Sequence, residues 1–69
     1  MDYDYQNMIV SLRNKLILTQ EEFAKLLGVS FDSVNRWERG HHNPTVKIKR
    51  KIIELCKQNN IKIIEKGEN

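Results

Sequence analysis

The side chains best suited to chemistry gather in the middle of the 69-residue chain. Residues 36–51 carry six basic side chains against one acidic residue, a local net charge of +5, whereas the remainder has six basic and eight acidic residues, a net charge of −2. A basic region on a slightly acidic body indicates a polyanion bound at one face, although a solvated charged helix would give the same asymmetry. Within this region, Arg36 has five N–H donors that suit the two acceptors on a guanine edge. Nucleic acid is the polyanion that would fit both the charge and these donors, but the charge asymmetry alone does not decide between a bound polyanion and a solvated helix.

Two short helices joined by a tight turn are predicted to position these side chains. Thr19 and Glu22 have the T-x-x-E spacing of a capping box, in which each side chain satisfies the other residue's backbone amide. Gly28 can end the first helix in the left-handed conformation, Ser30 can cap the second helix, and Gly40 can close it. A protein with this layout can place the second helix in the major groove of DNA while the first helix braces it on the backbone.

One further helix is predicted on either side of this pair. The first should span about residues 5–16, with Asp4 as its cap. The last should begin at a cap provided by Asn43 or Thr45 and run to about Gln58. The apolar residues at helical spacing, which should form the core, are Ile9, Leu12, Leu16, Phe23, Ala24, Leu27, Val34, Trp37, Ile48, Ile52, Leu55 and Cys56.

Length and composition limit what else the protein can be. With 39% hydrophobic and 30% charged residues the sequence is typical of one folded domain, too short for a second core or a deep pocket. The single cysteine, Cys56, excludes an internal disulfide, and the adjacent His41 and His42 lack the spacing of a zinc site. No apolar run has membrane-spanning length, and the first residues are acidic, unlike a signal peptide. These features predict a cytoplasmic protein with no membrane partner and no metal or other cofactor. Because no catalytic arrangement is apparent, we also expect that it is not an enzyme.

Residues 9–58 resemble the Cro/repressor-like, or Xre-type, helix-turn-helix family. The motifs that carry the resemblance are Leu12-Arg13, Leu18-Thr19-Gln20-Glu21-Glu22-Phe23-Ala24, Leu27-Gly28-Val29-Ser30 and Val34-Asn35-Arg36-Trp37-Glu38-Arg39-Gly40. The resemblance implies an all-α fold: a compact bundle of four or five helices with a lambda-repressor-like DNA-binding domain in residues 1–60 and a tail in residues 61–69. It also implies a sequence-specific double-stranded-DNA-binding transcriptional regulator, acting as a repressor by steric exclusion.

The family's DNA contacts fall on matching positions of this chain. The resemblance implies that a recognition helix of about Ser30–Arg39 enters the major groove, where Arg36 could fork onto guanine and Phe31 could pack on a thymine methyl. The base-reading residues would be Phe31, Asp32, Asn35 and Arg36. The phosphate-contacting residues would be Gln20, Ser30, Arg39, His41, Lys47, Lys49 and Arg50. Arg13 and Glu38 match an ion pair between the first and third helices of many members.

Some of these charged residues have alternative roles. Asp32 could accept a hydrogen bond from a cytosine amino group, hold Arg36 for a guanine, or only complement the positive end of its helix. Lys47, Lys49 and Arg50 lie in the first half of the last helix, the end that the helix dipole makes unfavourable for cations. Contact with phosphates is favoured for these three, and a solubilising role is the alternative.

The sequence departs from the family pattern at two places. Ile17 stands where a glycine often ends the first helix, and no fifth helix is apparent after Asn59. The apolar tail residues Ile61, Ile63 and Ile64 could form the contact of a homodimer or fold back over the core of the same chain. An antitoxin or adaptor, whose tail grips a protein partner, is the alternative function.

Overall fold

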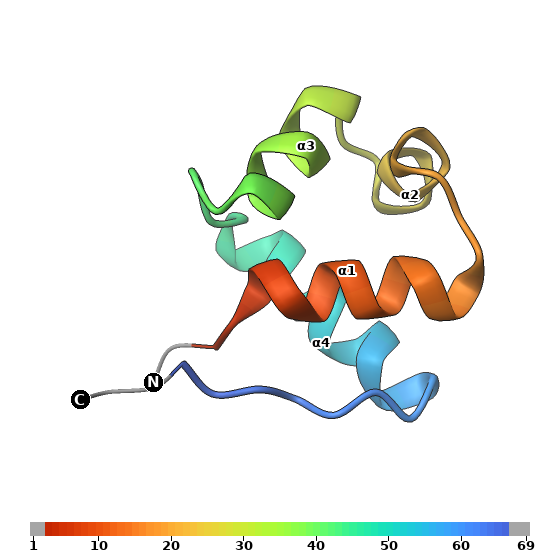
Figure 1. Cartoon of the computed structure of the whole chain (residues 1–69), viewed down its shortest axis with the longest axis vertical. Helices are drawn as coiled ribbons and strands as arrows, with labels where there is room; N and C mark the ends of the chain where they lie inside the picture. Colours follow the sequence, from red (N-terminus) through yellow and green to blue (C-terminus); the bar gives the residue numbers. More distant parts are fainter. Residues whose placement is uncertain (1–2, 67–69) are drawn as a thin grey trace.

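The computed structural model describes residues 3–66, which form four helices and an extended tail (Figure 1). The helices are α1 (Tyr5–Leu16), α2 (Gln20–Leu27), α3 (Phe31–Arg39) and α4 (Val46–Gln58). The predicted all-α class is confirmed, and residues 59–66 contain no fifth helix. Residues 1–2 of the predicted domain and 67–69 of the predicted tail lie outside the described residues.

Helix α1 begins at a side-chain cap and ends at a strained residue. The Asp4 carboxylate accepts hydrogen bonds from the backbone N–H of Asn7 at 3.1 Å and from its Nδ2 at 2.7 Å, so the predicted cap is present. Ile17 ends the helix at φ 56° and ψ 52°, in the left-handed region. A β-branched residue is costly there because its side chain crowds the backbone. Ile17 is also 87% exposed, so its burial cannot offset this strain.

Local hydrogen bonds fix the start of α2 and the turn between α2 and α3. The N–H of Glu22 donates to Thr19 Oγ1 at 3.1 Å and the N–H of Thr19 donates to Glu22 Oε1 at 2.9 Å, which confirms the capping box. Gly28 ends α2 at φ 74°, as predicted. Ser30 then caps α3 by accepting a hydrogen bond from the N–H of Ser33 at 3.2 Å. The conformation of Gly28 and the Ser30 cap together set the direction in which α3 follows α2.

The start of α4 matches the prediction in position but not in bonding. Thr45, one of the two predicted caps, occupies the cap position, but its side chain makes no capping hydrogen bond. Pro44, directly before it, is buried. The Thr45 carbonyl accepts the first helical hydrogen bond from the N–H of Lys49 at 2.8 Å. Packing and backbone bonding therefore begin this helix without a side-chain cap.

The core lies where α1 packs against both α3 and α4, while α2 packs against α3. Most of the predicted core residues are buried, and each large apolar side chain contributes about 1.5–3 kcal/mol by leaving water. Leu16 and Leu55 are only partly buried, whereas Tyr5 and Met8 join the core without having been predicted. Burial raises the pKa of the Cys56 thiol, which keeps it a neutral apolar group in the core.

The C-terminal tail packs on its own chain. Figure 1 shows it, in blue, running from the end of α4 back toward the start of α1. The backbone N–H of Asp4 donates to the Ile64 carbonyl at 2.8 Å, and Tyr3 and Glu65 form an isolated antiparallel bridge. Ile61, Ile63 and Ile64 are partly buried against the core. Of the two roles predicted for these isoleucines, the structure shows the covering of the same chain's core.

Candidate nucleic-acid interface

Helix α3 presents one buried and one exposed face. Val34 and Trp37 are buried on the inner side, as predicted. Asp32, Arg36 and Arg39 are exposed, and Phe31 at the start of the helix is 48% exposed. The exposed side therefore carries many hydrogen-bond donors and one apolar ring, which are the groups that recognise base edges and thymine methyls in the major groove.

The charges on α3 follow the helix dipole. Asp32 lies in the first turn, and Arg36 and Arg39 lie in the last turn, where acidic and basic side chains respectively are favoured. Asp32 and Arg36 form no ion pair within the described part of the chain. Within residues 3–66 the Arg36 guanidinium has no hydrogen-bond or ion-pair partner, so its donors remain available to a ligand.

A bidentate ion pair ties α3 to α1. Arg13 Nε donates to Glu38 Oε2 at 2.7 Å, and a second guanidinium nitrogen donates to Glu38 Oε1 at 3.1 Å. The Arg13 side chain is 22% exposed and the Glu38 side chain 10% exposed, so water screens the pair only partly. The remaining Arg13 nitrogen donates to the Leu18 carbonyl at 3.1 Å. The hydrogen bond with Glu38 raises the pKa of Arg13.

The same carboxylate begins a chain of side-chain hydrogen bonds. Gln20 Nε2 donates to Glu38 Oε1 at 2.9 Å, and Gln20 Oε1 accepts from Asn35 Nδ2 at 3.2 Å. Gln20 was predicted to contact a phosphate and Asn35 a base. Both residues have an internal partner as well, and each keeps a second amide N–H for a ligand.

The basic residues of α4 do not share one face. Lys49 is half-buried, with its Nζ 5.2 Å from the centroid of the Tyr5 ring, at the distance of a cation–π contact. Arg50 is exposed and lines a shallow hollow along α4. Lys51 Nζ donates to the Leu27 carbonyl, at the end of α2, at 3.5 Å. Only part of the predicted positive surface therefore points outward.

The other residues predicted to contact phosphates surround the two ends of α3. Ser30 is exposed at its start, where it also serves as the cap. Arg39 and His41 are exposed at its end, and the His41 N–H donates to the Arg36 carbonyl at 3.1 Å. Lys47 is exposed at the start of α4, shortly after this turn. These positions could flank a nucleic acid held against α3.

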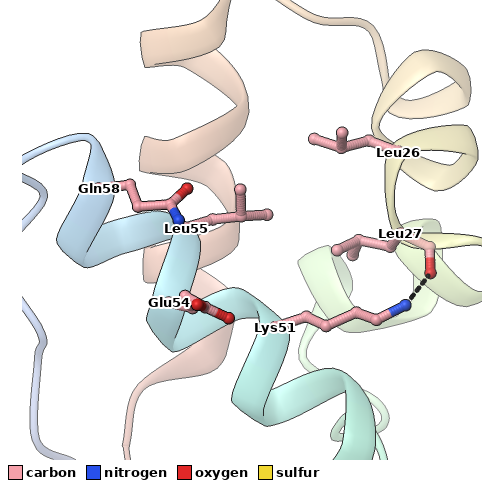
Figure 2. Close-up of a pocket in the computed structure, with 6 residues that line it drawn as sticks. All are labelled: Leu26, Leu27, Lys51, Glu54, Leu55 and Gln58. Atoms are coloured by element: carbon pink, nitrogen blue, oxygen red, sulfur yellow. Dashed lines mark hydrogen bonds between the residues drawn. The ribbon is translucent and has the colours of Figure 1, made fainter.

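A second surface feature lies between α2 and α4. Figure 2 shows this shallow hollow, in which Leu26 and Leu27 face residues of α4 and Lys51 reaches the Leu27 carbonyl. Its lining residues are Leu26, Leu27, Lys51, Glu54, Leu55 and Gln58. Within residues 3–66, no group of histidine, cysteine or carboxylate side chains is placed to hold a metal. No helix in the same range combines the length and apolar character needed to cross a bilayer.

The fold and the exposed face of α3 define a helix-turn-helix domain. The helix-turn-helix family model matches residues 9–63, and the chain belongs to this family. An uncharacterized HTH-type transcriptional regulator of Archaeoglobus fulgidus is 38% identical over 47 residues, which cover 68% of this chain and 66% of that protein. The chain thus spans just under two thirds of the length of this curated relative. No protein of solved structure matches the chain.

Proposed function

We propose that the protein is a sequence-specific double-stranded-DNA-binding transcriptional regulator, which places α3 in the major groove and represses by steric exclusion. The exposed, donor-rich face of α3 carries this proposal. The helix is capped at both ends and tied to α1 by the Arg13–Glu38 pair, so its side chains meet a ligand from a rigid support. Membership of the helix-turn-helix family and the name of the Archaeoglobus relative support the same function.

Three exposed side chains of α3 would provide direct base contacts. Arg36 can donate two hydrogen bonds to the O6 and N7 atoms of guanine, a contact worth about 1–3 kcal/mol of discrimination. Phe31 can pack on a thymine methyl group, because half of its surface is open. Asp32 can accept a hydrogen bond from a cytosine amino group, and its carboxylate would also repel nearby phosphates, which penalises binding out of register.

Phosphates would be held around this face. The capping box leaves the backbone amides of Gln20 and Glu21 without a helical acceptor, so the start of α2 can bind a phosphate oxygen. Ser30, Arg39 and His41 lie at the two ends of α3 and are exposed. The proposed phosphate contacts are therefore of two kinds: backbone amide donors at the start of α2, and side chains at the two ends of α3.

The basic residues of α4 support the proposal unequally. Lys47 and Arg50 are exposed and can reach a phosphate without losing an internal contact. Lys49 would have to leave the Tyr5 ring, which costs about 0.5–1 kcal/mol for a contact of this exposure. Among the basic residues of this helix, Lys47 is therefore the best suited to test sequence-independent attraction to phosphates.

The alternative function, an antitoxin or adaptor that grips a partner with its tail, gains no support from the tail. Its isoleucines are already partly buried on the same chain. A homodimer on DNA remains part of the proposal for a different reason: one helix-turn-helix contacts only a half-site, and tight binding usually needs two copies about a twofold axis.

Selection of bound sites from random duplexes tests this function. We expect the full chain to enrich one short motif, and a palindromic motif would show that two copies bind together. Affinity for the enriched site should fall steeply with salt, because phosphate contacts release counterions. A chain that enriches no motif and binds no duplex at low salt, yet co-purifies with a protein partner, would be an interaction module instead.

A further inference from the structure

The hydrogen-bonded chain from Arg13 to Asn35 fixes more than the position of α3. Glu38 has only acceptor atoms, so the group that Gln20 turns toward it has to be the Nε2 amide. The Gln20 oxygen must then face Asn35, and Asn35 must present its Nδ2 nitrogen to that oxygen. The opposite orientation of either amide would set two acceptors against each other. Arg13 keeps this arrangement in place by holding the carboxylate in two hydrogen bonds.

This arrangement determines which atoms Asn35 can offer to a ligand. Its Nδ2 has a second N–H, and its Oδ1 accepts no hydrogen bond within the described residues. The side chain is half-buried on α3, one residue before the exposed Arg36. An amide that offers one donor and one acceptor side by side matches the N7 and N6 groups of adenine in the major groove. A phosphate, which only accepts, would use the N–H and leave Oδ1 without a partner.

We propose that Asn35 contacts an adenine and that Gln20 is the positioning residue that sets the orientation of its amide. This inference rests on the proposed DNA-binding function. It names the base that Asn35 contacts and a residue, Gln20, that affects sequence preference by acting through Asn35. Gln20 itself touches no base. Its effect on sequence preference arises because an Asn35 amide without this partner can turn over and present the reversed pattern of donor and acceptor.

The orientation can be tested first without DNA, on the full ¹⁵N-labelled chain. One side-chain amide proton of Asn35 should exchange with water more slowly than those of Asn14, an exposed asparagine on α1 whose side chain has no internal partner among the described residues. Gln20→Met keeps the size of the side chain and removes its hydrogen bonds, so it should abolish the difference. Equal exchange at Asn35 and Asn14 in the wild type would overturn the hydrogen-bonded chain.

The second test measures binding to a set of duplexes in which each base pair of the selected site is replaced in turn. Asn35→Ala should reduce the preference for adenine at one base pair by roughly 5- to 100-fold. Gln20→Met should reduce preference at that same base pair and at no other. Gln58→Met, the same change on the far helix α4, should leave every preference unchanged. Asn35→Asp retains the shape of the side chain and should also lose the preference, because its carboxylate opposes the Gln20 oxygen.

Two results would overturn the inference. If Gln20→Met lowered affinity for all duplexes by one factor with unchanged preferences, Gln20 would be a phosphate contact only. If Asn35→Ala changed no base preference, Asn35 would not contact a base. Failure of the wild type to select any duplex would overturn the proposed function and the base contact with it, whereas the exchange measurement would still report on the hydrogen-bonded chain.

Discussion

Replacing Arg13 should destabilise the fold more than replacing its ion-pair partner Glu38. In Arg13→Met, the Glu38 carboxylate loses both guanidinium donors and keeps only the Gln20 amide, while its side chain is 10% exposed. In Glu38→Gln, the Arg13 guanidinium keeps the Leu18 carbonyl and has 22% of its surface open to water. The arginine substitution therefore leaves the more poorly compensated charge.

The size of the effect follows from burial. Removing one partner of a fully buried ion pair costs about 3–5 kcal/mol, and the partial exposure here places Arg13→Met near the lower end, at about 3 kcal/mol. Glu38→Gln should cost about 1.5–2 kcal/mol, because Arg13 loses charge-assisted hydrogen bonds but stays solvated. The double variant buries no unpaired charge and should cost about 1–2 kcal/mol less than the sum of the two single variants.

Urea unfolding of the four proteins gives the coupling energy directly. Glu54→Gln and Lys57→Met, on the exposed surface of α4, form a control pair of the same chemistry, and their coupling should stay within about 0.5 kcal/mol. A coupling between Arg13 and Glu38 no larger than about 0.5 kcal/mol would refute the reasoning, because unconnected sites are additive within that margin.

Three further predictions concern stability. Ile17→Gly should raise the free energy of unfolding by about 1 kcal/mol, since glycine adopts the left-handed conformation without steric cost, whereas Ile17→Ala should gain much less; urea unfolding separates the two. A chain ending at Asn60 should lose roughly 2–4 kcal/mol with the half-buried tail isoleucines, and an unchanged urea midpoint would contradict the packing described. Because burial raises the pKa of the Cys56 thiol, the folded state disfavours the thiolate, and this contribution to stability is lost as pH rises above about 8.5, the value of an unfolded thiol. Urea unfolding at neutral and alkaline pH should show a smaller alkaline loss for Cys56→Ala than for the wild type.

Local chemistry made much of the fold predictable. Thr19 with Glu22, Gly28 and Gly40 mark helix ends through bonds to neighbouring residues, and the structure has those ends. Thr45 occupies the cap position at the start of α4, as one of the two predicted alternatives, but its side chain makes no capping hydrogen bond, because its backbone carbonyl and the buried Pro44 already hold the segment. Tyr5 is buried beside Lys49 of α4 and the Tyr3 ring, so the spacing within α1 did not predict its burial.

The site was predictable only in part for the same reason. The Arg13–Glu38 pair was expected because the family resemblance supplies a contact between distant helices, and the pair is present. The partnership of Gln20 with Asn35 depends on how α2 crosses α3, which no spacing along the chain specifies. The contact of Lys49 with Tyr5 likewise depends on the packing of α4 on α1. The sequence shows that the chain has two amides and an acid at these positions, but nothing in it indicated that the three side chains meet.

The most direct test of the account is the affinity of Arg36→Ala and Lys47→Ala for the selected site and for a scrambled duplex, measured across a salt series. Arg36→Ala should lose about 1–3 kcal/mol on the selected site, lose much less on the scrambled duplex, and relax preference at one base pair. Lys47→Ala should weaken binding to both duplexes equally and lower the salt slope by about one unit. If Arg36→Ala lost the same affinity on both duplexes, Arg36 would contact the backbone, and the exposed face of α3 would not be the surface that recognises sequence.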